Sequence, residues 1–146
     1  MKYIVMSFKP LYAHEIISQV KDCEVRTYFG HLSSGDKVII YSSSPEKAFI
    51  GEFTIYELYV GSYVDVCKYI ERRCSLFDEL NWGFIKRKYS TSRRKLVVIK
   101  ISDVVKYDKP IPLNEVRRYI PEFRPPMSYA VVPEEFIRLI HTHVIV

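Results

Sequence analysis

The sequence predicts an α+β fold, a small mixed β-barrel with short helices over its ends. Five or six strand-like segments are interleaved with short helical ones, and their spacing along the chain is irregular. The strand-like segments between residues 23 and 60 follow one another through turns, whereas a doubly wound parallel sheet would need helices of even length between its strands. By length, residues 1–146 are expected to form one domain.

The first half of the chain predicts four strands and one helix. Alternating and continuous apolar runs place the strands at residues 3–7, 23–29, 37–42 and 48–60. The helix follows Pro10 and is expected to place an apolar stripe inward, formed by Leu11, Ile16, Ile17 and Val20. Gly51 lies within the fourth strand and predicts a bulge or a close backbone approach there.

The second half predicts a helix over 62–80 with Ser62 as its N-cap, interrupted by Asn81-Trp82-Gly83. A basic, irregular stretch and a strand over 95–107 follow, and Pro110 and Pro112 flank a turn. The remaining elements are expected to be a helix over 113–120 with Val116, Tyr119 and Ile120 inward, irregular chain over 121–126, a strand over 127–132, a helix over 133–141 and an edge strand over 142–146.

Three cysteines without a Cys-x-x-Cys pair argue against a disulfide framework and against a zinc site. Cys67 and Cys74 are seven residues apart, so they are expected on one face of a helix as core residues. The N-terminal segment is too short for a signal peptide, and no apolar run is long enough to cross a membrane. The chain is therefore expected to be cytoplasmic, without membrane contact.

Positive charge is concentrated in one part of the chain. The net charge is +5, yet residues 86–124 hold twelve Lys and Arg against four Asp and Glu, which leaves −3 for the remaining residues. A local positive field is typical of a polyanion binder, because phosphate neutralisation dominates such affinity. The alternative is a solvated face that keeps the protein soluble. Six basic residues are candidates for gripping a nucleic-acid backbone: Lys86, Arg87, Lys88, Arg93, Arg94 and Lys95.

An ordered set of short motifs resembles the ASCH domain of the PUA-like superfamily. Lys21, Glu24 and Arg26 form Lys-x-x-Glu-x-Arg, and they are followed by Gly35-Asp36, an apolar strand and Gly51-Glu52-Phe53. The motif match covers about residues 1–60. The later segment that begins PIPLNEVRRYIPEF resembles uncharacterised archaeal ASCH-like and EVE-like proteins.

The resemblance implies an RNA- or nucleotide-binding cleft between the barrel and the N-terminal helix, and roles in RNA metabolism or transcription regulation. One similar bacterial branch hydrolyses acylated cytidines with a lysine and a threonine on this strand. Lys21 matches that lysine, but Glu24 stands where the threonine would be and makes a poor acyl acceptor. The implied ligand-binding set, including the walls of the cleft, is Lys9, Lys21, Glu24, Arg26, Ser42, Ser43, Arg124, Ser128 and Tyr129.

Glu24 and Arg26 lie on one face of their strand, so they can pair with each other or converge on a ligand. The Arg26 fork can grip phosphate or a base edge, Glu24 can accept from an exocyclic amine, and Lys21 offers a point charge. The alternative is an internal salt bridge that fixes the strand, with Asp36 as another possible partner of Arg26.

No sequence motif supports a nucleophilic enzyme, a zinc hydrolase or a nucleotide hydrolase, and no metal or cofactor is expected. The favoured hypothesis is a non-catalytic module that binds RNA or a nucleotide-like ligand. The alternative is a small hydrolase that acts on a modified nucleoside or RNA in the same cleft, with Lys21 as base and Glu24 as acid or water activator. The sequence does not indicate the oligomeric state.

Overall fold

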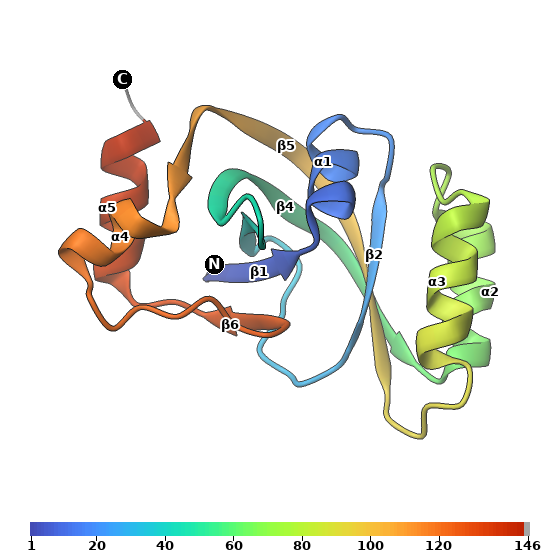
Figure 1. The fold of residues 1–146 in the computed structure, drawn as a ribbon. Helices are drawn as coiled ribbons and strands as arrows, with labels where there is room; N and C mark the ends of the chain where they lie inside the picture. The colour runs from blue at the N-terminus through green and yellow to red at the C-terminus, as the bar shows by residue number, and fades with distance from the viewer. Residues whose placement is uncertain (145–146) are drawn as a thin grey trace.

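The computed structural model describes residues 1–144, in which the strands form one mixed sheet with the order β2-β5-β4-β3-β1-β6 (Figure 1). β1 and β3 pair in parallel and every other pair is antiparallel. This curved half-barrel confirms the predicted fold class. The strands are β1 (Tyr3–Phe8), β2 (Cys23–Thr27), β3 (Lys37–Ser42), β4 (Ala48–Gly61), β5 (Leu96–Pro112) and β6 (Tyr129–Val131).

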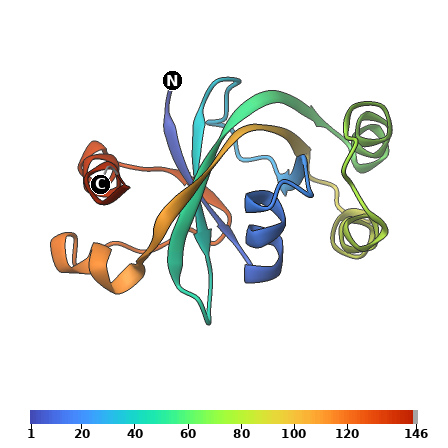
Figure 2. The same ribbon diagram turned by 90° about the horizontal axis from the view of Figure 1, so that it is seen from above.

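Among residues 1–144, five helices pack around this sheet at three places (Figure 2). They are α1 (Pro10–Ile17), α2 (Tyr63–Arg73), α3 (Glu79–Tyr89), α4 (Leu113–Tyr119) and α5 (Glu134–Val144). Strand alternation explains the division: along β1, Ile4 and Met6 face the core that includes α1, whereas Val5 faces the core under α4 and α5. A third core joins β2 and β5 to α2 and α3. Within residues 1–144, no helix is long and apolar enough to cross a membrane.

Gly51 lies at an irregularity of β4, as the sequence predicts. The register between β4 and β5 shifts between Phe49 and Gly51. A Cβ atom on Gly51 would lie 2.4 Å from Val105 O and 2.4 Å from Ile17 Cδ1. The missing side chain therefore lets α1 and β5 approach the same point of β4.

The helical region between β4 and β5 is divided differently from the prediction. Ser62 caps α2, and its Oγ accepts a hydrogen bond from the Asp65 backbone N–H. The chain then breaks after Arg73, whereas residues 81–83 lie inside α3. The Asp78 carboxylate accepts from the Asn81 N–H and caps this second helix, so the basic residues up to Lys88 are helical rather than irregular.

Three other local predictions are wrong. β5 continues through Pro110 to Pro112 and pairs with the start of β4, so no turn separates these prolines. Tyr119 is 61% exposed, because α4 places Val116 inward and this residue outward. α1 turns Ala13 and Ile16 inward, so Leu11 at its start is exposed, and the helix ends at Ile17, so Val20 lies beyond it and is exposed as well.

At the C-terminus, residues 142–144 continue α5 instead of forming an edge strand. The rest of that predicted strand, residues 145–146, lies outside the described residues.

A disulfide joins Cys23 to Cys74, although the sequence argued against one. The two residues are 51 positions apart, and their Cα atoms lie 6.1 Å from each other because β2 packs beside the connection between α2 and α3. Cys67 is unpaired and partly buried. Cys74 follows α2 rather than sharing a helix face with it, so spacing along the chain misplaced this pair.

Candidate functional site

A cleft of about 490 Å³ opens beside the first helix, between α1, β2, α3 and the segment 125–128. Aromatic side chains form much of its wall: Phe8, Tyr12, Phe77, Phe84 and Tyr89. Its polar lining includes the three residues of the Lys-x-x-Glu-x-Arg motif. A volume of this size is typical of sites that hold a small molecule or one nucleotide.

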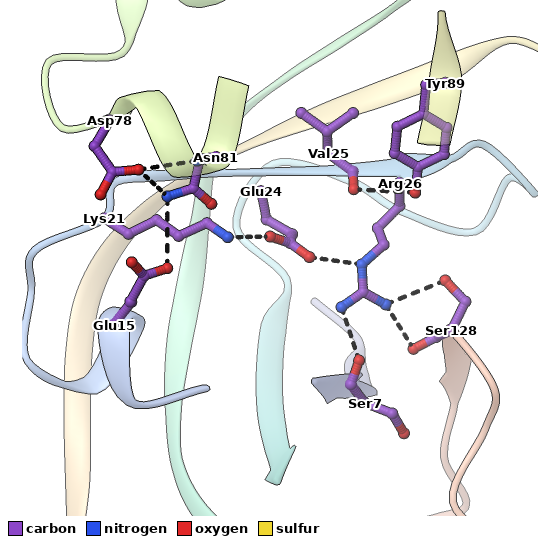
Figure 3. Close-up of polar contacts among 10 residues, drawn as sticks. All are labelled: Ser7, Glu15, Lys21, Glu24, Val25, Arg26, Asp78, Asn81, Tyr89 and Ser128. Atoms are coloured by element: carbon purple, nitrogen blue, oxygen red, sulfur yellow. Dashed lines mark hydrogen bonds and ion pairs between the residues drawn. The ribbon is translucent and has the colours of Figure 1, made fainter. Parts of the chain in front are cut away.

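Lys21, Glu24 and Arg26 form a continuous chain of charges at the inner end of the cleft (Figure 3). Lys21 Nζ lies 2.7 Å from Glu24 Oε1, and Arg26 Nε lies 2.7 Å from Glu24 Oε2. All three side chains are at most 10% exposed. The local sequence explains this geometry. Alternation along β2 places Glu24 and Arg26 on one face, and Lys21 lies just before the strand begins.

Glu24 is held in its ionised form. Burial by itself raises the pKa of its carboxyl group, but the charges and hydrogen bonds of Lys21 and Arg26 outweigh this effect and lower the pKa below its usual value. The cleft therefore presents a fixed carboxylate flanked by two cations, with a net positive charge for the three groups.

Arg26 also connects the two open sides of the half-barrel. Its Nη2 donates to Ser7 O at 2.7 Å, and its Nη1 donates to the backbone O and the Oγ of Ser128, both at 3.2 Å. The guanidinium carbon lies 4.7 Å from the Phe8 ring centroid. β2 is thus joined to β1 and to the segment before β6 through a side chain instead of a strand ladder.

Asn81 forms a second polar corner of the cleft, close to Lys21 (Figure 3). Its Nδ2 donates to Asp78 Oδ1 at 2.8 Å and to Glu15 Oε1 at 3.5 Å, so the amide is oriented by α3's cap and by α1. Lys21 Nζ lies 5.0 Å from the Tyr12 ring centroid, in a cation–π arrangement.

The structure brings six of the nine ligand-binding candidates to the cleft: Lys9, Lys21, Glu24, Arg26, Ser43 and Ser128. Ser42 is fully buried and does not line it. Arg124 is exposed outside the lining. The Tyr129 hydroxyl accepts from the Phe29 N–H at 2.6 Å and donates to Gly30 O at 3.2 Å, beside the rim.

The six basic candidates for backbone contact are all exposed. Lys86, Arg87 and Lys88 occupy the last turn of α3, and Lys88 lines the cleft. Arg93, Arg94 and Lys95 lie in the connection from α3 to β5.

Sequence reasoning missed the contribution of α3 to the wall. Asn81, Ile85 and Tyr89 recur every four residues on the face that lines the cleft. This spacing and the Asp78 cap were available signals. They were masked by the interpretation of Asn81-Trp82-Gly83 as a helix break.

One group of potential metal ligands occurs among residues 1–144: Asp22, Cys23 and Cys74. Its two sulfurs are bonded to each other. The Asp22 carboxylate accepts from the backbone N–H groups of Ser75 at 2.9 Å and Leu76 at 3.1 Å. The disulfide and these two hydrogen bonds therefore hold the α2–α3 connection against the start of β2.

Comparison with known proteins identifies both a family and a fold. A family model described as a domain of unknown function, DUF365, matches residues 4–121. No curated protein matches the chain. Among solved structures, the chain is similar to ASCH from Zymomonas mobilis, with 23% identity and a TM-score of 0.81 over 97% of this chain and 94% of that chain.

Two further structures are similar at lower scores. The N-terminal domain of Staphylothermus marinus McrB has 17% identity and a TM-score of 0.59, over 96% of this chain and 93% of that chain. A Pseudomonas syringae protein has 16% identity and a TM-score of 0.60, over 96% of this chain and 97% of that chain. At these identities the similarity shows the fold, which is ASCH-like.

Proposed function

The chain belongs to the DUF365 family, whose function is unknown, and we propose that it is an RNA-binding module that holds one base or nucleotide in the cleft. One observation carries the proposal: an aromatic-walled cleft of about 490 Å³ whose inner end contains the buried Lys21–Glu24–Arg26 chain. The ASCH-like fold is consistent with nucleic-acid binding.

The wall supports recognition of a flat ring. The Tyr12 and Phe84 ring centroids lie 5.2 Å apart, and Lys88 Nζ lies 5.5 Å from the Phe84 centroid. Aromatic faces hold bases by stacking and accept every base, since each has a π-face. Polar groups at the inner end, including Lys21 and Asn81, then supply the orientation that stacking lacks.

The charges at the mouth support an anionic ligand. Lys9 and Lys88 are exposed and line the cleft, and further cations follow α3 in the chain. Exposed lysines at a rim suit phosphate groups that remain partly hydrated, whereas the two inner cations are already paired with the Glu24 carboxylate. The proposed pose therefore places the base inward and the phosphate at the rim.

The test is a titration of short labelled single-stranded and structured RNAs, with matched DNAs, at two salt concentrations. We expect salt-sensitive binding with a preference for RNA. Phe84→Leu should weaken it about tenfold, because a stacking partner contributes about 1–3 kcal/mol per base. Tyr119→Leu removes a more exposed aromatic residue, on α4 and outside the cleft lining, and should leave affinity unchanged. Absence of binding to every polyanion at low salt would overturn the proposal.

A hydrolase is the second candidate, favoured by the 2.7 Å contact between Lys21 Nζ and Glu24 Oε1 at the inner end. The lowered pKa of Glu24 makes it an activator of water rather than an acid at neutral pH. Incubation with modified nucleosides, followed by chromatography, tests this role. Turnover that disappears in Lys21→Ala and Glu24→Gln would favour the enzyme, and binding without product would favour the module.

Several finer points stay predictions: action of residues 1–146 as one domain, closeness to archaeal ASCH- and EVE-like proteins, a cytoplasmic location, and a role in RNA metabolism or transcription regulation.

A further inference from the structure

We propose that a second nucleotide, adjacent in the same strand to the one in the cleft, stacks on Phe29 at the rim. This inference rests on the proposed function and adds that the ligand is a single-stranded nucleic acid of at least two nucleotides. The site is an exposed shelf made by Phe29, Arg94 and Tyr129, which we call the rim shelf.

The rim shelf presents an aromatic face to solvent. Phe29 is 51% exposed, although its ring is large and apolar. Its centroid lies 6.0 Å from that of Tyr129, at an interplanar angle of 49°. The Arg94 guanidinium carbon lies 5.6 Å from the Phe29 centroid. An exposed ring accompanied by an arginine combines the two groups that hold an unpaired nucleotide, a stacking surface and a phosphate partner.

The shelf is held in a fixed position before any ligand arrives. The Tyr129 hydroxyl accepts from the Phe29 N–H at 2.6 Å and donates to Gly30 O at 3.2 Å. Gly30 has a φ of +79°, which lets the chain turn directly after Phe29. These contacts hold the backbone at Phe29, and the neighbouring Tyr129 ring and Arg94 guanidinium lie against the Phe29 ring, so stacking there costs less conformational entropy.

The shelf adjoins residues of the cleft along the chain. Ser128, which lines the cleft and accepts from Arg26, directly precedes Tyr129 in the chain. Along the other edge, Arg26 and Phe29 are three positions apart, an extended distance of about 10 Å. A base bound at the inner end and its neighbour in the strand can therefore contact the cleft and the shelf at the same time.

Charge complementarity favours a polynucleotide over a protein partner at this surface. Arg93 and Lys95, which flank Arg94 in the chain, are exposed, and Lys9 and Lys88 lie at the mouth. A phosphate that links the two nucleotides would pass between these cations. Counterion release then makes the added affinity depend on salt.

The experiment compares a mononucleotide, a dinucleotide and a hexanucleotide of one base, in RNA and DNA forms, by titration calorimetry or anisotropy. The wild-type chain should bind the dinucleotide about tenfold more tightly than the mononucleotide. Phe29→Leu, which keeps apolar volume but removes the ring, should abolish that gain and leave mononucleotide affinity within about twofold. Phe29→Trp should retain the gain, and Tyr119→Leu serves as the matched exposed-aromatic control.

A second variant protects the test against a folding defect at Phe29. Arg94→Gln leaves the ring in place at an exposed position and should weaken the dinucleotide and hexanucleotide several-fold, with no effect on the mononucleotide. Thermal melting checks that each variant is folded.

The outcomes separate the two proposals. Normal mononucleotide binding with no length dependence, or with neither variant affecting oligonucleotides, overturns the rim shelf alone. Equal loss of mononucleotide and oligonucleotide affinity in Phe29→Leu also overturns it, because the residue would then act only through the cleft. If no nucleotide of any length binds, the proposed function fails and the shelf fails with it.

Discussion

At the residue scale, the arrangement of the Lys-x-x-Glu-x-Arg motif is compatible with both of its interpretations, an internal salt bridge and a ligand-binding site. Glu24 and Arg26 pair with each other, and both Glu24 oxygens contact a cation. Asp36 is not the partner of Arg26, because its carboxylate accepts from the backbone N–H groups of Lys2 and Ser33. The pair is therefore a structural link that also lines the cleft, and its ligand-binding role stays a prediction.

Glu24→Gln should destabilise the fold strongly. The change leaves Lys21 and Arg26 buried without their counter-charge, and breaking a buried ion pair in this way costs roughly 3–5 kcal/mol. The control is Glu134→Gln on α5, whose pair with Arg138 is exposed and contributes at most about 1 kcal/mol. Chemical unfolding of both variants measures the two free energies. Equal and small losses would contradict the argument.

The same carboxylate creates a pH dependence with a definite sign. The folded-state pKa of Glu24 lies below the unfolded value near 4.5, so its contribution is fully present above pH 4.5. It is lost as the pH falls from there through the folded-state pKa. Melting temperatures between pH 7 and pH 3 should therefore fall less steeply in Glu24→Gln than in the wild type. Parallel curves would exclude this role of Glu24.

At the element scale, glycines explain one success and one failure of prediction. Gly51 in β4 marks a close approach of α1 and β5, as expected from a glycine within a strand. Gly83 contributed to the interpretation of residues 81–83 as a helix break, yet it lies inside α3. The Asp78 cap and the buried contacts of Ile85 and Tyr89 outweigh its weak helix propensity.

Alanine at these two glycines should have opposite effects. Gly51→Ala places a Cβ atom 2.4 Å from a backbone oxygen of β5, so we expect a loss of about 1–3 kcal/mol through overpacking. Gly83→Ala meets only the flexible end of Arg87 at 3.2 Å and should gain about 0.5–1 kcal/mol of helix stability. Thermal and denaturant unfolding of both variants provides the measurement. Destabilisation of similar size in both would contradict the packing argument at Gly51.

At the scale of the whole molecule, the basic segment 86–124 does not form one patch. β5 carries the chain from the α3 end of the molecule to α4 at the other side (Figure 1). Lys88 lines the cleft and Arg94 lies over Phe29 of the rim shelf, whereas Arg117 and Arg118 lie on α4. Charge counted along the sequence therefore overstates the positive field at the cleft.

Nucleic-acid affinity should depend on only one of these groups of cations. Arg94→Ala combined with Lys95→Ala should reduce the slope of log affinity against log salt by about 1.4, since each phosphate contact on a single strand contributes about 0.7. Lys106→Ala combined with Lys109→Ala removes two exposed lysines from β5 beyond the cleft and should leave the slope unchanged. Equal changes in both double variants would indicate a diffuse field instead of a local contact.

The sequence alone determined the elements whose cause is local. Alternation and apolar runs identified the strands, Ser62 and Pro10 marked helix starts, and Gly51 marked a close approach. The same alternation placed Glu24 and Arg26 on one face, and the short motif supported the ASCH-like fold. These features depend on neighbours within a few residues, so periodicity and propensity are sufficient to predict them.

The tertiary structure alone decided which distant groups meet. The Cys23–Cys74 disulfide spans 51 residues, Arg26 reaches Ser128 across 102, and α3 supplies Asn81 and Tyr89 to a cleft that begins at β1. The periodicity of the sequence does not predict such pairings, because they depend on the curvature of the sheet and on which helix packs against each of its faces. The inner charges of the cleft were therefore predictable from the sequence, whereas the wall that α3 contributes was not.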